Sequence, residues 1–591
     1  MMKKHYSIFA LALAALFVLS CEPLSFQKVT GDVDDADMWI VPDMAKGVLF
    51  QAYNAIPNRP DSYDGNFLDV ATDNAVTNYQ DAGVYRLAHG QFTSMNCPIS
   101  VWSEAYTQFQ NIHKFLENGL TEKTHYDEYS AASDAAVKDQ LLGEAYYLRA
   151  WWGAYLLQHH GGRTLDGDAL GYYIVTSFVS EEDASDLSKM VRNTYEECVE
   201  QICADCDSAF KHLPLTPTGD AYIGRATGLM SEFLKARVLF TAASPAYQPA
   251  SIVRINAPGD FTVVDAAAYK AKWERAAAQA WKVIGLSGNT NFTACTKTDF
   301  VDGVSSPAHF VFRFYFKNAA MEGRHYPPFY WGKAYTTPSQ NLVDAYPMKA
   351  NGYPITDPAA AYDPATPYAG RDNRLETTIY HQGSIFGANA SRIDVVYGGK
   401  DAESFMNGGS QGSRTGYYLH KFMSEAADLL NPTTSSTAVH FYPTMRMAEM
   451  FLDLAEASNE AWGPVTAGDG IAKSAYDIIK EIRQKAGGIV DDQYIETVKG
   501  SVDDFRKLIL NERRLEFAFE NVRFWDLRRT LQPLDETVRG MVVARDGAGV
   551  LTYSTRDVES RELNSLKYYY LPVPYSEIKK NPEGMINNMD Y

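Results

Sequence analysis

Apolar side chains recur every three or four residues through several long stretches of this 591-residue chain. The clearest stretches cover residues 141–157, 225–243, 273–284, 445–461 and 503–527. This spacing places the apolar side chains on one face of a helix, so each stretch predicts an amphipathic α-helix. Repeated alanines would let neighbouring helices approach closely. We therefore expect an array of helical hairpins, although no clean 34-residue period identifies the repeat type.

The pattern changes between residues 287 and 440. Gly, Pro, Asn, Ser and Tyr dominate this region, and few segments hold a helical or strand period. Long irregular stretches in a compact protein are usually functional or disordered, and this one carries too many aromatic side chains for disorder. The sequence therefore predicts a mainly α fold in which an ordered, loop-rich region interrupts the array of helices.

The amino terminus has the pattern of an export signal. Lys3 and Lys4 precede an apolar run over residues 8–20, and Cys21 follows directly. A basic start, a short apolar run and a small residue before the cleavage point are typical of a secretory signal peptide. The run is shorter than the roughly 20 residues that a membrane-spanning helix needs.

Residues 18–21 resemble the lipobox of a bacterial lipoprotein. This resemblance predicts a signal peptide over residues 1–20, acyl chains on Cys21 after cleavage, and a lipid-anchored tether over residues 21–40. Several acyl chains on one residue would hold the protein durably at a membrane. The alternative is an ordinary secreted protein in which Cys21 has no special role.

The charge of the chain excludes one class of partner. The formal net charge is −19, whereas nucleic-acid binding depends on Lys and Arg side chains that neutralise phosphates. We therefore expect no nucleic-acid partner. The acidic residues between 32 and 37 lack the glycine and the closing Glu of a calcium loop, which favours a solvated spacer.

The remaining cysteines do not form a disulfide framework, because their number is odd and their spacing wide. Cys203 and Cys206 form a C-x-x-C inside a predicted helix, where buried apolar packing is expected and a redox or zinc site is the alternative. We expect no cofactor and no metal. The five cysteines after Cys21 are Cys97, Cys198, Cys203, Cys206 and Cys295.

Enzyme motifs are weak or missing in this sequence. Residues 408–412 match G-x-S-x-G, but a glycine-rich loop replaces the strand and helix that a nucleophile elbow requires. His159 and His160 are adjacent at the end of a helix and cannot point at one metal ion. There is no H-E-x-x-H and no phosphate-binding loop. A pair of carboxylates for glycoside hydrolysis cannot be identified from sequence, and we expect no catalysis.

Several segments in order resemble the SusD/RagB family of outer-membrane lipoproteins. The matches run from about residue 45 to the carboxyl terminus, and no single one would be sufficient. They are GEAYYLRAW at 143–151, GRAT at 224–227, PSQNLVDAY at 338–346, RDNRL at 371–375, RMAE at 446–449, ERRLEFAFE at 512–520 and LPVP at 571–574.

The resemblance implies a scaffold of tetratricopeptide-like hairpins with a loop-rich lobe laid against it. It also implies a cell-surface protein that caps a SusC-like TonB-dependent transporter, captures glycan or in some members peptide, and has no catalytic activity. We expect an N-terminal helical region over 41–286, the lobe over 287–440 and a C-terminal helical part over 441–591. Only one acidic residue, Glu22, directly follows Cys21, which weakens the expectation of outward display.

The family motifs themselves are expected to be structural. Arg149, Arg237, Glu512, Arg513 and Glu516 stand on helix faces beside apolar residues. Ion pairs that hold helices together explain these charges more simply than contact with a ligand.

The ligand site is expected where aromatic rings and hydrogen-bonding side chains occur together. A glycan offers apolar C–H faces that pack on aromatic rings, and hydroxyls that polar side chains can bind. Two segments carry both, a loop near 69–100 and the stretch 324–335. The predicted contacts are Asn78, Tyr79, Asp81, Tyr85, Arg86, Tyr330 and Trp331.

Other interpretations remain open. Each aromatic ring could instead pack inside the lobe. A peptide-capturing protein would have fewer stacking aromatics, and its acidic charge would favour cationic peptides. A helical-repeat adaptor that binds only proteins would use no sugar site at all.

Overall fold

The computed structural model describes residues 35–591, except 181, 183–184, 220–222, 304–308, 388–390, 404–411 and 427–428. Helices are the main element and the sheets are small, which confirms the predicted mainly α class. The signal peptide and Cys21 lie outside the described residues, so lipid attachment stays a prediction. Within the described ranges, no helix is both long and apolar enough to cross a membrane.

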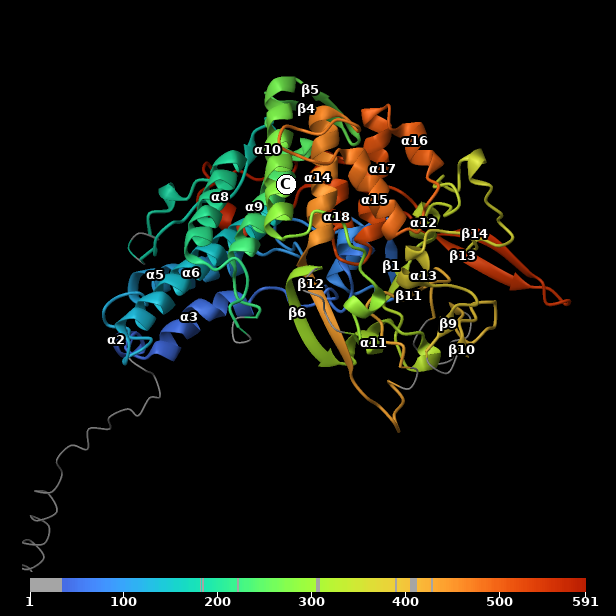
Figure 1. Ribbon diagram of the computed structural model, residues 1–591, viewed down its shortest axis with the longest axis horizontal. Helices are drawn as coiled ribbons and strands as arrows, with labels where there is room; N and C mark the ends of the chain where they lie inside the picture. Colours follow the sequence, from blue (N-terminus) through green and yellow to red (C-terminus); the bar gives the residue numbers. More distant parts are fainter. Residues whose placement is uncertain are drawn as a thin grey trace, which may run out of the picture.

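The helical scaffold is a row of helices in which each packs against the next (Figure 1). α10 packs directly against α14, although about 160 residues separate them along the chain. The chain thus leaves the row after α10, forms most of the lobe, and returns at α14. The row consists of α3 (Pro42–Asn54), α5 (Trp102–Asn118), α6 (Ala131–His160), α8 (Tyr195–His212), α9 (Gly228–Ala243), α10 (Ala266–Leu286), α14 (Met447–Trp462) and α17 (Val502–Glu516), with α15 (Ala475–Lys485) beside α14.

Local capping explains where several of these helices begin. The Ser130 side chain accepts a hydrogen bond from the Ser133 backbone N–H in the first turn of α6. Thr194 and Glu197 form a reciprocal capping box at the start of α8, and Thr227 caps α9. Such caps satisfy N–H groups that have no partner inside the helix. After α9, Pro245 begins a separate 3₁₀ turn and the helix does not continue.

Paired charges connect neighbouring helices, as the sequence predicts. Arg149 of α6 binds Asp205 of α8 with two hydrogen bonds of 2.9 and 2.6 Å. Arg237 of α9 likewise binds Glu449 of α14. Because both ends of each pair are hydrogen-bonded, the charges are compensated where they are buried. The C-x-x-C cysteines are buried in α8, as the packing interpretation expects.

The lobe consists of small antiparallel two-stranded sheets joined by loops and short helices. The pairs are β6 (Phe310–Asn318) with β12 (Ala438–Arg446), β1 (Ala75–Thr77) with β7 (Thr336–Pro338), β8 (Ile379–Tyr380) with β11 (Tyr418–Leu419), β9 (Ile385–Phe386) with β10 (Ser391–Arg392), and β13 (Val538–Arg545) with β14 (Leu551–Glu559), whose hairpin projects from the molecule in Figure 1. Two further pairs occur in the sequence between consecutive scaffold helices. They are β2 (Gly162–Arg163) with β3 (Ala169–Leu170), between α6 and α8, and β4 (Val253–Ala257) with β5 (Asp260–Val263), between α9 and α10. The short helices are α2 (Asp35–Met38), α4 (Gly83–Ala88), α11 (Ala320–His325), α12 (Gln340–Ala345), α13 (Arg374–Thr378), α16 (Gln493–Val498), α18 (Arg523–Arg529) and α19 (Tyr575–Ile578).

Two hydrophobic cores correspond to the scaffold and the lobe. The lobe core contains Phe67, Leu68 and Val84 although these residues lie between two scaffold helices in the sequence. It also contains Met541 from the C-terminal part. The lobe is therefore assembled from three separate parts of the chain, and the segment around 69–100 belongs structurally to it.

Candidate functional site

The two predicted binding segments, 69–100 and 324–335, lie side by side in the lobe. Antiparallel pairing of β1 with β7 joins them. Directly beyond β1, the Asn78 backbone N–H donates to the Tyr335 carbonyl oxygen over 2.9 Å. The structure therefore brings into one place two segments that are more than 200 residues apart in the chain.

At this junction two tyrosine rings form a stack. The ring centroids of Tyr79 and Tyr335 are 5.2 Å apart and the ring planes differ by 17°. Tyr79 is 37% exposed, Tyr335 is half-buried, and Lys333 Nζ lies 5.7 Å from the Tyr335 centroid. The junction of the two segments thus carries a pair of stacked, partly exposed tyrosine rings with a positive charge beside them.

Buried hydrogen bonds fix the backbone that carries this stack. The Tyr79 backbone N–H donates to Thr77 Oγ1 over 2.9 Å, and Thr77 Oγ1 donates in turn to Asn66 Oδ1 over 2.8 Å. Thr336 Oγ1 donates to the same oxygen over 3.1 Å. Asn66 and both threonines are fully buried. The platform is thus preorganised, and a ligand would need to order little of the protein on binding.

The polar residues expected near the stack lie at different depths. Asp81 and Arg86 are exposed on and beside α4. Tyr85 is half-buried, and its ring centroid lies 4.1 Å from that of His89. Asn78 is half-buried, and its Nδ2 donates to the Gly412 carbonyl over 3.1 Å. Asp81 and Arg86 are therefore the polar side chains of this set that are most accessible to a ligand.

Tyr330 is packed inside the lobe and is only 7% exposed. Its ring stacks on Phe386 at 4.1 Å, and its hydroxyl donates to Ser391 Oγ over 2.6 Å. Lys400 Nζ donates to the same hydroxyl over 2.6 Å. These contacts cover the ring, so Tyr330 acts as an anchor for the segment and offers little surface to a ligand.

Trp331, the next residue, points outward and is 47% exposed. Its backbone has a left-handed φ of +63°, which is unusual for a bulky side chain. Trp331 directly follows the 3₁₀ turn η6 (Pro328–Tyr330). The turn is tight, because a Cβ on the next residue, Gly332, would lie 2.1 Å from the Tyr326 carbonyl oxygen. Phe329 is also 47% exposed.

Sequence reasoning missed Tyr335 and Lys333 as parts of the site. Tyr335 becomes a platform only because β1 pairs with β7 and brings Tyr79 onto it. The available signal was its position immediately before a strand in an aromatic-rich stretch, which does not indicate a partner.

A cavity of about 180 Å³ lies elsewhere, between α6, α9, α14, α18 and β12. Its walls include aromatic rings such as Tyr155 and Trp525 and the paired charges of Arg237 and Arg513. Burial lowers the pKa of His159 in the wall to about 4, so this imidazole is neutral. None of the cavity's lining residues belongs to the two predicted binding segments, so the cavity is a space separate from the exposed aromatic rings of the lobe.

Models of known protein families match both the N-terminal and the C-terminal part of the chain. A model described as the SusD family matches residues 302–591. A second, described as starch-binding associating with outer membrane, matches residues 40–228. Among curated proteins, the SusD-like protein P2 of Formosa agariphila is 28% identical over 152 residues, which are 25% of this chain and 26% of that protein. The match thus spans about a quarter of that relative's length.

Solved structures share the whole architecture. A SusD-like protein of Bacteroides fragilis aligns with a TM-score of 0.70 and 21% identity over 95% of this chain and 99% of that chain. Surface glycan-binding protein A of Bacteroides thetaiotaomicron, in complex with laminarihexaose, aligns with a TM-score of 0.56 and 14% identity over 93% and 99%. At these identities the likeness shows a common fold.

Proposed function

Because this chain belongs to the SusD/RagB family, we propose that it is a cell-surface lipoprotein that binds oligosaccharide or polysaccharide without cleaving it and delivers it to a SusC-like TonB-dependent transporter. The observation that carries the glycan part is the exposed, rigidly held stack of Tyr79 on Tyr335. In this proposal, anchoring through Cys21 rests on the lipobox pattern of residues 18–21, and the transporter partner rests on family membership.

The stack suits a sugar ring for a physical reason. The C–H face of a pyranose is apolar and flat, and it packs against an aromatic ring in the same way as another ring would. Each aromatic contact adds about 0.5–1.5 kcal/mol beyond the burial of area. Two or three such contacts, with hydroxyls bound to Asp81 and Arg86, correspond to dissociation constants between about millimolar and micromolar. Modest affinity suits a protein that must release its ligand to a transporter.

Trp331 and Phe329 are exposed on the same segment as Tyr335 and provide further aromatic rings that a sugar could contact. Strain in the Trp331 backbone is tolerated because the surrounding turn fixes it, and strained residues of this kind concentrate at functional sites. We assign Trp331 as a second sugar platform, with Tyr330 as its structural anchor. Asn78 contributes to the position of the loop through its bond to Gly412.

Binding assays on the full chain test this proposal. The first probes are laminarihexaose and linear malto-oligosaccharides. Laminarihexaose is bound in the structure of surface glycan-binding protein A, and malto-oligosaccharides are fragments of the starch that the family description names. Trp331→Ala should weaken binding about 2- to 10-fold. Tyr129→Ala is the matched control, because Tyr129 is 98% exposed on a scaffold loop, and it should leave binding unchanged.

Each negative result selects an alternative. Failure to bind any glycan on a broad array, with binding of cationic peptides, would replace glycan by peptide capture. Purification of the protein from its own membrane should recover a large transporter barrel in stoichiometric amount. Recovery without a barrel would favour the adaptor interpretation.

A further inference from the structure

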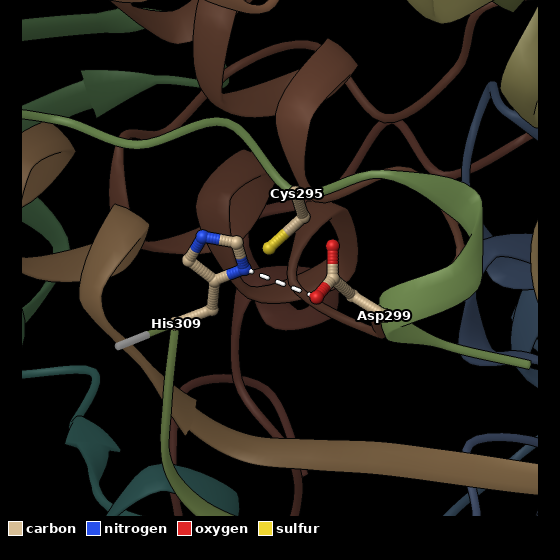
Figure 2. Close-up of side chains that lie close together, drawn as sticks. All are labelled: Cys295, Asp299 and His309. Carbon is tan, nitrogen blue, oxygen red and sulfur yellow. Dashed lines mark hydrogen bonds and ion pairs between the residues drawn. The ribbon is translucent and has the colours of Figure 1, made fainter. Parts of the chain in front are cut away.

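A cysteine, an aspartate and a histidine side chain converge in the segment between α10 and β6. Cys295, Asp299 and His309 each offer a ligand atom, and these atoms all lie within 4.8 Å of one another. Figure 2 shows the thiol, the carboxylate and the imidazole directed toward a common space. Among the residues that the structure describes, no other group of three or more such side chains comes as close.

We propose that Cys295, Asp299 and His309 form a binding site for one zinc ion. Zinc is bound by Cys sulfur at about 2.3 Å, His nitrogen at about 2.0–2.1 Å and carboxylate oxygen at about 2.0–2.2 Å in a tetrahedron. Such bonds place the nitrogen and oxygen ligands roughly 3.3 Å apart. His309 Nδ1 and Asp299 Oδ1 are 3.2 Å apart in the structure. Imidazole with thiolate favours zinc over the harder calcium and magnesium ions.

The carboxylate is already oriented by neighbours, as in established zinc sites. Asp299 Oδ2 accepts hydrogen bonds from the Thr296 backbone N–H over 2.7 Å and from Thr296 Oγ1 over 2.9 Å. This capping box at the start of η5 (Lys297–Asp299) leaves Oδ1 directed at His309. Second-layer contacts of this kind fix ligand geometry and typically change metal affinity 10- to 100-fold when removed.

Space for a fourth ligand lies next to the cluster. A cavity of about 10 Å³ is lined by Cys295 and His309 together with Phe292, Met447 and Ala448. That volume is about what one water molecule requires. Three protein ligands and one water would complete a tetrahedral zinc sphere. The cavity is independent of the ligand distances, and both observations point to the same site.

The position of the site indicates a structural role. Cys295 and Asp299 follow α10, where the chain leaves the scaffold, and His309 directly precedes β6. The His309 carbonyl oxygen also accepts a hydrogen bond from the backbone N–H of Met447, the first residue of α14. A zinc ion here would tie the start of the lobe to the junction between α10 and α14. It would therefore hold the lobe in place on the scaffold.

A titration of the chelator-treated full chain with zinc alone tests the proposal. We expect one ion per chain, a higher melting temperature with zinc, and a near-ultraviolet thiolate-to-metal band when cobalt replaces zinc. Cys295→Ser should abolish that band and weaken zinc binding at least 10-fold, and His309→Ala should weaken binding similarly. Thr296→Val should weaken it about 10- to 100-fold. Cys97→Ser is the control, because Cys97 is also half-buried and free, and it should bind as the parent does.

Two results would overturn the zinc site. One is the absence of stoichiometric zinc binding and of the cobalt band in the parent protein, which would leave an ordinary Asp–His hydrogen bond beside a thiol. The other is full-affinity binding by Cys295→Ser, which would place the metal elsewhere. If His309→Ala does not fold, the spectrum of the parent and of Cys295→Ser decides alone. Glycan binding is measured separately, so either proposal can fail without the other.

Discussion

The scaffold and the lobe keep their shapes by different means. In the scaffold, regular helices satisfy their own backbone, and buried charge pairs such as Arg513 with Asp453 and Asp526 hold helix against helix. In the lobe, side chains satisfy an irregular backbone. Arg371, 5% exposed, donates to the carbonyl oxygens of Val343, Tyr346 and Pro367.

This difference shows why the candidate binding surface is in the lobe. A scaffold helix is stabilised mainly by burying its apolar face, so the aromatic side chains on that face are in the core and cannot contact a ligand. A loop whose backbone is held by buried polar side chains can expose its rings instead. Asn66 does this for Tyr79, and the turn around Gly332 does it for Trp331. The lobe thus offers rigid aromatic surfaces that the scaffold cannot.

The largest effect on stability is expected when a buried charge that joins the scaffold to the lobe is removed. Glu512 of α17 is fully buried and binds Arg374 of the lobe over 2.6 Å and Arg483 of α15 over 2.7 Å. Glu512→Ala would leave both guanidinium groups without this partner. We expect the apparent free energy of unfolding to fall by about 3–5 kcal/mol, measured by denaturant titration.

The control for this change is Glu562→Ala, because Glu562 is exposed. It should alter stability by less than about 0.5 kcal/mol. If the two variants were equally stable, the ion pairs of Glu512 would not contribute to stability. Buried charge pairs would then not be what holds the two regions together.

The next prediction concerns the anchor of the lobe. Tyr330→Ala removes a buried ring from Phe386 and should destabilise the lobe by about 3 kcal/mol, whereas Tyr330→Phe loses only the hydroxyl bonds and about 1 kcal/mol. Hydrogen exchange should show faster opening in the lobe than in α6 or α8. Trp331→Ala is the matched neighbour and should change stability by less than about 0.5 kcal/mol. The reverse ranking of Tyr330 and Trp331 would contradict their assigned roles.

Prediction from sequence was good where one period describes a segment. The helical stretches 141–157, 225–243, 273–284 and 445–461 and the ion pairs of Arg149 and Arg237 follow from spacing and residue type. The single helix predicted over 503–527 is wrong, because α17 ends at Glu516 and α18 begins only at Arg523, with the left-handed residues Phe519 and Asn521 between them. The packing of α10 on α14 could not be predicted, because it depends on where an insertion of about 160 residues returns. Tyr330 and Trp331 are adjacent and both aromatic, yet one is buried and the other exposed. Trp331 also adopts a positive φ, and no sequence period reports either feature.

Acid should weaken a particular contact of the lobe. Burial would raise the pKa of Asp61, but the neighbouring His325, whose Nε2 lies 3.7 Å from Oδ2, and the charge of Arg324 lower that pKa to about 2. The folded value is below the unfolded value of about 3.8, so this stabilisation is present above pH 4 and is lost as the pH falls through 2. The effect amounts to about 2 kcal/mol.

Asp61→Asn should remove this component from the acid side of the stability curve. Glu516, whose pKa is also lowered to about 2 because Arg446 and Arg374 outweigh its burial, remains as an internal reference for the scaffold. Melting temperatures from pH 5 to 2, with hydrogen exchange in each region, make the measurement. An unchanged pH dependence of the lobe would show that Asp61 is not the acid-sensitive contact.

The smallest expected effect sharpens the contrast most, because it separates binding from stability. Tyr79→Ala should reduce glycan affinity about 2- to 10-fold while stability changes little, since Tyr79 is 37% exposed. Tyr79→Phe keeps the ring and should bind as the parent does. Tyr335→Ala removes the ring on which Tyr79 stacks and should also weaken binding. If the two rings act as one platform, the double variant loses less affinity than the sum of the single losses, because the first change already disrupts the stack. Strictly additive losses, measured by calorimetry with one oligosaccharide, would mean two independent contacts, and no loss in either single variant would remove the stack from the site.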